Sequence, residues 1–135
     1  MNGKQYVQLA LVTEAKDVSA IVERIQQVST LRLLHAMMGI QTESGEFTDA
    51  LKRFIFYGEP VDKVNLGEEL GDLFWYIAIA CDELGISFEQ VWEKNIAKLK
   101  ARYGEKFSEA AALERNLPVE RKTLEAPDID LESRV

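Results

Sequence analysis

The chain has 135 residues, a formal net charge of −7, 47% hydrophobic residues, one cysteine and one histidine. This length predicts one domain with a real core, the negative charge argues against nucleic acid as a partner, and the lone cysteine excludes an intrachain disulfide and a cysteine zinc cage. No apolar stretch reaches the ~20 residues that span a bilayer, and residues 1–5 lack the order of a signal peptide. We therefore expect a cytoplasmic protein that has no membrane partner.

The spacing of apolar residues predicts an all-α chain. Residues 1–13 are ambiguous between a strand, an extended arm and the start of a helix. A first helix is expected over about 14–28, and a break at Ser29-Thr30 is expected to cap a second helix over about 31–57. Gly58 and Pro60 form the stop signal that ends the second helix.

Two further caps are expected in the second half of the chain. Asn65 with Glu68 resembles a capping box that starts a third helix, which ends at Gly85. Ser87 with Gln90 predicts a capping box for a fourth helix through about Tyr103, and a short helix should follow over 108–115. Residues 117–135 are charged and broken by proline, so we interpret them as a flexible or peripheral tail after a domain over 1–116.

Two pairs of acids carry the strongest chemical signal. Glu43 and Glu46 lie three residues apart on the second expected helix, and Glu69 and Asp72 do so on the third, so each pair shares a helix face. Such pairs are common on solvated helices, but the second pair opens the run 73–81, which is apolar all round and typical of a buried helix. Packed together, the four carboxylates would repel one another unless a cation is present. An all-oxygen cluster suits Mg²⁺ or Mn²⁺.

The fourth expected helix carries a polar and basic stripe. Asn95, Lys98 and Arg102 stand at i, i+3 and i+7 and therefore share one face. A solvated basic edge is one interpretation of this stripe. Beside an acidic metal cluster it also offers what a polyphosphate needs, because lysine acts as a point charge and arginine as a bidentate fork.

The ordered set of these motifs resembles the MazG-like all-α NTP pyrophosphohydrolases of the short, single-domain type. The resemblance covers about 30–108 and rests on Glu43-Ser44-Gly45-Glu46, Glu68-Glu69-Leu70-Gly71-Asp72-Leu73, and Asn95-Ile96-Ala97-Lys98-Leu99 with Arg102-Tyr103. It implies a four-helix-bundle-like fold completed by a partner subunit, as a homodimer or a dimer of dimers. It also implies Mg²⁺-dependent hydrolysis of (d)NTPs to (d)NMP and pyrophosphate. In many relatives another acid precedes the first motif, where this chain has Thr42.

The resemblance assigns roles to the motif residues. The four acids would be the catalytic metal ligands, and Asn95, Lys98 and Arg102 would bind the substrate. Candidate base-pocket residues are His35, Phe54, Trp75 and Trp92, although core packing is the favoured explanation for each of them. Within the enzyme class, a narrow dUTP or dCTP pyrophosphatase is the nearest alternative.

Two other classes of protein share some of these features. A di-iron bundle wants Glu-x-x-His motifs, and the only histidine, His35, has Arg32 at the position where the glutamate belongs. A non-catalytic helical oligomer that binds or senses nucleotides is the stronger alternative. The apolar run over 73–81 also predicts a symmetric interface, because one chain of this length cannot cover every side of that helix.

Overall fold

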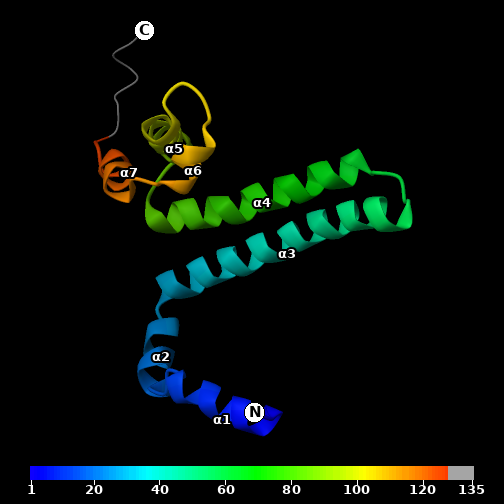
Figure 1. The fold of residues 1–135 in the computed structure, drawn as a ribbon, viewed down its shortest axis with the longest axis vertical. Helices are drawn as coiled ribbons and strands as arrows, with labels where there is room; N and C mark the ends of the chain where they lie inside the picture. Colours follow the sequence, from blue (N-terminus) through cyan, green and yellow to red (C-terminus); the bar gives the residue numbers. More distant parts are fainter. Residues whose placement is uncertain (128–135) are drawn as a thin grey trace. The chain divides into compact units, whose positions relative to one another are not determined.

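The computed structural model describes residues 1–127, and every regular element in this range is a helix (Figure 1). The all-α prediction is therefore confirmed. The elements in chain order are α1 (Gly3–Ala10), the 3-10 helix η1 (Leu11–Thr13), α2 (Val18–Ile25), α3 (Val28–Tyr57), α4 (Lys63–Leu84), α5 (Phe88–Tyr103), α6 (Glu109–Leu113) and α7 (Leu117–Leu124). The chain divides into two compact units, Met1–Ala80 and Cys81–Val135, which we describe separately. The predicted domain boundary at residue 116 stays a prediction.

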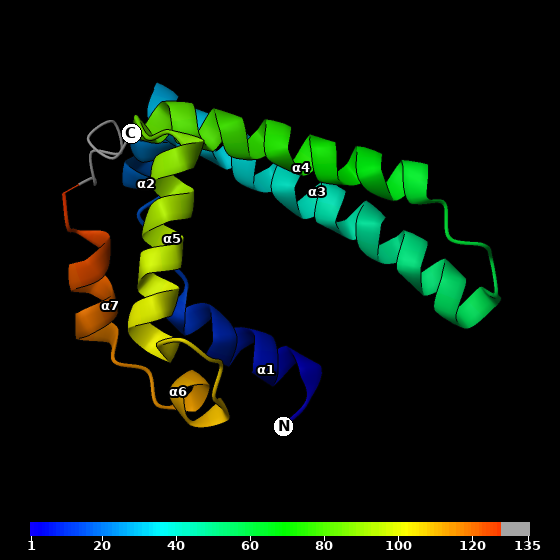
Figure 2. The ribbon, with the colours of Figure 1, turned by 90° about the horizontal axis from the view of Figure 1, so that it is seen from above.

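The first unit is built on the antiparallel pair of α3 and α4, which lie side by side (Figure 2). Gly58 ends α3 in the left-handed conformation, with φ of 70°, as a residue without a side chain can do at no steric cost. The loop over 58–62 then returns the chain. Because both helices run along each other, side chains far apart in the sequence face one another across the pair.

The starts of α3 and α4 differ from the predicted ones. α3 begins at Val28, after Gln27, whose side chain makes no capping bond, so the break expected at Ser29-Thr30 is wrong. At α4 the cap is Asp62, whose Oδ1 accepts from the backbone N–H groups of Val64 and Asn65 at 2.9 and 3.1 Å. A carboxylate there satisfies donors of the first turn that have no partner inside the helix. Asn65 is therefore inside the helix rather than its cap.

The first 27 residues are also helical in part. α1 has a capping box between Asn2 and Gln5, and α2 is capped by Asp17, which accepts from the N–H of Ala20 at 3.0 Å. The first helix expected over about 14–28 is thus shorter than predicted. The ambiguity over residues 1–13 is settled in favour of a helix.

Small residues allow α3 to approach α4. Ala36 is fully buried, and Gly39 lies against the ring of Tyr76, which a methyl group at residue 39 would overlap. Glu43 follows at i+7 from Ala36, so it lies on the same face of α3. The contact that brings the helices together therefore also directs Glu43 toward α4.

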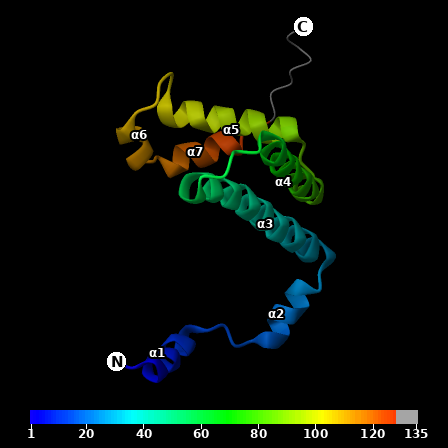
Figure 3. The ribbon, with the colours of Figure 1, turned by 90° about the vertical axis from the view of Figure 1, so that its right-hand side faces the viewer.

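The second unit contains α5 and α7, which lie alongside one another, with α6 between them in the sequence (Figure 3). The predicted capping box of Ser87 and Gln90 is confirmed, with bonds of 3.1 and 2.8 Å in the two directions. Residues 117–124 form α7, capped by Asn116, so this part of the segment predicted as a flexible or peripheral tail is helical. The rest of the predicted tail from residue 128 lies outside the described residues.

Much apolar surface remains uncovered on the first unit. The run expected to be buried contains Phe74 and Trp75, whose exposed fractions are 53% and 55%. On α3, Phe54 is 48% exposed. Cys81, at the end of the same run and in the second unit, is buried. A single chain therefore leaves part of the apolar run exposed. The predicted symmetric interface through this run was based on that expectation, and the interface itself stays a prediction.

Candidate metal centre

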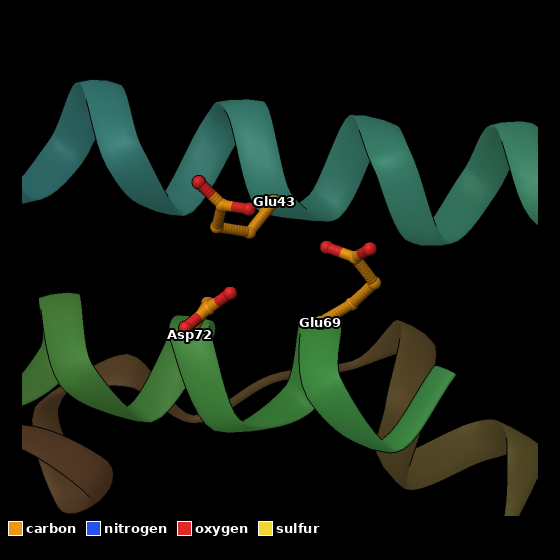
Figure 4. A group of neighbouring side chains, drawn as sticks. All are labelled: Glu43, Glu69 and Asp72. Carbon is orange, nitrogen blue, oxygen red and sulfur yellow. The ribbon is translucent and has the colours of Figure 1, made fainter. Parts of the chain in front are cut away.

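Three of the four predicted acids converge between α3 and α4. Glu43 comes from α3 and meets Glu69 and Asp72 of α4, and one oxygen from each lies within 4.8 Å of the other two (Figure 4). Glu69 is buried, Glu43 is half-buried and Asp72 is exposed. The i, i+3 spacing on α4 places Glu69 and Asp72 on one face, and the antiparallel partner supplies the third carboxylate.

Two neutral side chains orient these carboxylates. The amide Nδ2 of Asn65 donates to Oε1 of Glu69 at 2.8 Å, one helical turn away. The hydroxyl of Thr42 lies 3.1 Å from Oε1 of Glu43 and 2.9 Å from the backbone oxygen of Gly39, and it can donate its one proton to either of them. Hydrogen bonds of this kind hold metal ligands in place at known sites. Thr42 thus places a hydrogen-bond donor, and no charge, beside the converging acids.

Glu46 is exposed and does not belong to the converging set. It nevertheless lies in the same negative field, because the pKa of its carboxyl is raised chiefly by the charge of Glu69 and then by that of Glu43. A neighbouring like charge disfavours ionisation. The four acids therefore interact electrostatically even though only three of them meet.

The arrangement fits a hard divalent cation. All the atoms that could bind a metal ion here are carboxylate oxygens, the ligands that Mg²⁺ and Mn²⁺ prefer. Two oxygens bound to one Mg²⁺ at about 2.0–2.1 Å lie at most about 4.2 Å apart, so side-chain rotation alone can bring these oxygens onto one ion. A cation would also relieve the repulsion between a buried carboxylate and its two neighbours.

A pocket of about 290 Å³ adjoins the acids within the first unit. Arg53 on its wall donates from Nε and Nη2 to the carboxylate of Glu59 at 2.8 and 3.0 Å. Sequence reasoning missed Arg53, although its position two turns after Glu46 on the same helix was a usable signal. The lining residues are Glu46, Asp49, Ala50, Arg53, Glu59, Pro60, Asp62, Asn65 and Glu69.

Three aromatic rings, from His35, Trp75 and Tyr76, lie between α3 and α4. Along these helices they are on the side of the acids opposite the pocket. The ring of His35 from α3 meets those of Trp75 and Tyr76 from α4 edge to face, with centroids 6.3 and 5.7 Å apart. Two of the candidate base-pocket residues, His35 and Trp75, are thus brought together. Trp92 belongs to the second unit, where the centre of its ring lies 5.6 Å from the centre of the Phe88 ring. Tyr76 was not singled out from the sequence, although it follows Asp72 by one turn.

The predicted substrate stripe lies on α5 in the second unit. Lys98 and Arg102 are half-buried and Asn95 is exposed. Arg102 is engaged with Glu120 of α7, a contact that the sequence did not indicate. That the stripe meets the acids of the first unit stays a prediction.

Among residues 1–127, no helix combines the length and the apolar character that a transmembrane span needs.

Comparison with known proteins places these residues in a family. A family model of the MazG nucleotide pyrophosphohydrolase domain matches residues 31–107, more than half of the chain. The Gene 37 protein of Mycobacterium phage L5 is 30% identical over 74 residues, which cover 52% of this chain and 65% of that protein. No solved structure matches. The family match includes both acid pairs and the α5 stripe, and the chain therefore belongs to the MazG nucleotide pyrophosphohydrolase domain family.

Proposed function

We propose that the protein is a Mg²⁺-dependent nucleoside triphosphate pyrophosphohydrolase, which converts (d)NTP and water to (d)NMP and pyrophosphate. The observation that carries the proposal is the convergence of Glu43, Glu69 and Asp72 from two helices within a MazG-family domain. A nucleotide pyrophosphohydrolase needs a site that holds cations against phosphate oxygens. Carboxylates arranged at this spacing are suited to that task.

The side chains divide the work by their chemistry. The acids would hold Mg²⁺, with Mn²⁺ as a substitute, and the bound cation would lower the pKa of water and neutralise charge that develops on the phosphates. Asn65 keeps Glu69 in its orientation. Lys98 and Arg102 would contact phosphate, and Asn95 would bond to phosphate or sugar. Because phosphoryl transfer depends mainly on positioning and electrostatics, no covalent role is required of the protein.

We also propose that the active form is a homodimer or a dimer of dimers and that it acts in the cytoplasm on the nucleotide pool. Support for the assembly comes from the exposed apolar residues of α3 and α4. The preferred base stays open, with dUTP and dCTP as the narrow alternatives. The aromatic group of His35, Trp75 and Tyr76 offers flat apolar surfaces of the kind on which a base stacks.

A panel of canonical and modified nucleoside triphosphates, assayed for pyrophosphate release with Mg²⁺, Mn²⁺ or EDTA, tests the proposal. We expect Mg²⁺-dependent turnover with the monophosphate as the second product. Replacement of Glu43, Glu46, Glu69 or Asp72 by alanine should lower turnover at least about a hundredfold, as expected when catalytic charge stabilisation is lost. The far-UV circular dichroism should stay helical in each variant.

The matched control is Glu68→Ala, because Glu68 is an exposed acid of α4 outside the converging group. Its turnover should stay close to that of the unmodified protein. Near-normal activity in Glu69→Ala or Asp72→Ala would contradict the metal assignment. Triphosphate binding with no turnover under any metal would instead favour a non-catalytic protein that binds or senses nucleotides.

A further inference from the structure

Outside the acid cluster, the described residues contain one other buried acid, Glu120 of α7. Its exposed fraction is only 4%. It accepts from Nε and Nη2 of Arg102 at 2.9 and 2.5 Å, and from Nη2 of Arg115 at 2.7 Å. A buried carboxylate needs such partners, and here two guanidinium groups from different parts of the unit supply them.

The charges of this group do not cancel. Two guanidinium groups and one carboxylate leave a net positive charge, and the two arginines hold the pKa of Glu120 down at about 2, so it stays ionised. The bonds from Arg102 use the Nε–Nη2 edge of its fork. Arg102 also makes a side-chain hydrogen bond with Tyr103. The bonds to Glu120 leave its Nη1 group unused, and an arginine can direct such a donor at an anion.

Arg102 is held in one orientation by these bonds. Its side chain is 15% exposed, and its guanidinium carbon also lies 5.5 Å from the centre of the Tyr103 ring. A long side chain fixed in this way loses little further freedom on meeting a ligand. Arg115, by contrast, is 47% exposed and shares the same carboxylate.

We propose that Glu120 is a positioning residue, which fixes the guanidinium of Arg102 for contact with the substrate phosphates and so makes α7 part of the nucleotide site. The inference rests on the proposed function, because Arg102 has a phosphate role only there. The proposal gives a functional role to a residue outside the segment 31–107 that matches the family, since α7 begins at Leu117.

Steady-state kinetics of Glu120→Gln in the full chain test this proposal. The amide keeps the shape of the side chain but removes the charge that holds both arginines. We expect KM for the triphosphate to rise on the order of tenfold with kcat changed much less, because a misplaced phosphate contact weakens binding. Arg102→Ala should raise KM at least as much, and the double variant should show no further rise beyond Arg102→Ala.

Two controls separate positioning from a purely structural role. Arg115→Ala removes the second partner of Glu120 and leaves the Arg102 fork in place, so it should lower the melting temperature without raising KM. Glu125→Gln removes an exposed ion pair of the same helix, Arg121 with Glu125, and should change neither quantity.

Three outcomes decide the matter. Unchanged KM in Glu120→Gln, or the same KM rise in Arg115→Ala as in Glu120→Gln, would overturn the inference and leave Glu120 as an anchor of α7. Additive effects in the double variant would overturn it as well. Absence of any metal-dependent turnover in the unmodified protein is a different failure, which falls on the proposed function itself.

Discussion

Two glycines of α3 have opposite surroundings. A methyl group added at Gly39 would overlap the ring of Tyr76, whereas one added at Gly45 would meet nothing within 4 Å. We therefore expect Gly39→Ala to destabilise the protein by about 1–3 kcal/mol, because it forces α3 and α4 apart. Gly45→Ala on the same helix should stabilise it by up to about 1 kcal/mol through helix propensity. Urea unfolding in EDTA measures both, and equal stabilities for the two variants would contradict the close approach.

Asn65 donates a hydrogen bond to Glu69, one of the acids of the candidate metal centre. Asn65→Ala removes that donor, so the carboxylate gains freedom and loses one of its hydrogen bonds. Loss of such a supporting contact lowers metal affinity or activity about 10–100-fold at known sites, and we expect the Mg²⁺ concentration for half-maximal activity to rise by a factor in that range. Glu68→Gln, an exposed neighbour on α4, serves as the control. A variant of Asn65 with an unchanged Mg²⁺ titration would show that the bond has no part in metal binding.

At the scale of elements, α7 is attached through an ionised acid, and its attachment is therefore sensitive to pH. The folded-state pKa of Glu120 is lowered to about 2 from an ordinary 4.5, so its stabilising contribution is fully present above about pH 4.5 and is lost as the pH falls toward 2. We expect the difference in unfolding free energy between the unmodified protein and Glu120→Gln to shrink across that interval. Urea titrations at pH 7, 4.5, 3.5 and 2.5 measure it. A difference that stays constant down to pH 2.5 would contradict the low pKa.

Helix types and most helix ends follow from local sequence signals. The Ser87 and Gln90 box and the glycine stop at residue 58 were predictable, because the donor, the acceptor and the turn residue all lie within a few positions of one another. Asp62 was not predicted as the cap of α4, because Asn65 with Glu68 three residues later resembles the capping-box pattern and Asp62 does not. The true cap left Asn65 available to Glu69, a contact that no capping pattern signals.

The structure of α7 could not be read from its own residues. Its segment is charged and contains a proline, which is the composition of a solvated tail. Glu120 of this helix pairs with Arg102, which lies 18 positions away in the sequence, and no local pattern signals such a contact. The pattern of acids predicted four converging carboxylates, and three of them meet, because an i, i+3 pair fixes its own helix face. Glu46 stays outside the converging group, since the way two helices pair cannot be read from the spacing within either one.

At the scale of the whole molecule, the uncovered apolar residues predict assembly. We expect the protein to form a dimer or a dimer of dimers through the run over 73–81, since large side chains such as Phe74 and Trp75 are about half exposed on the single chain. Ile79→Glu should therefore give monomer or aggregate and abolish turnover. Gln41→Glu, a charge at an exposed polar position, is the control. Light scattering that finds the unmodified chain as a stable, active monomer at micromolar concentration would refute the interface.

The three converging acids all lie between residues 43 and 72, on two helices joined by the short loop over 58–62. Contacts between positions this near in the chain close quickly, because little loop entropy has to be lost. Closing the hairpin of α3 and α4 also brings the three negative charges together, which slows its formation in a medium without divalent cations. If the acids bind magnesium as we propose, magnesium should therefore accelerate refolding, and the same carboxylates would serve the folding of the helix pair as well as the proposed reaction.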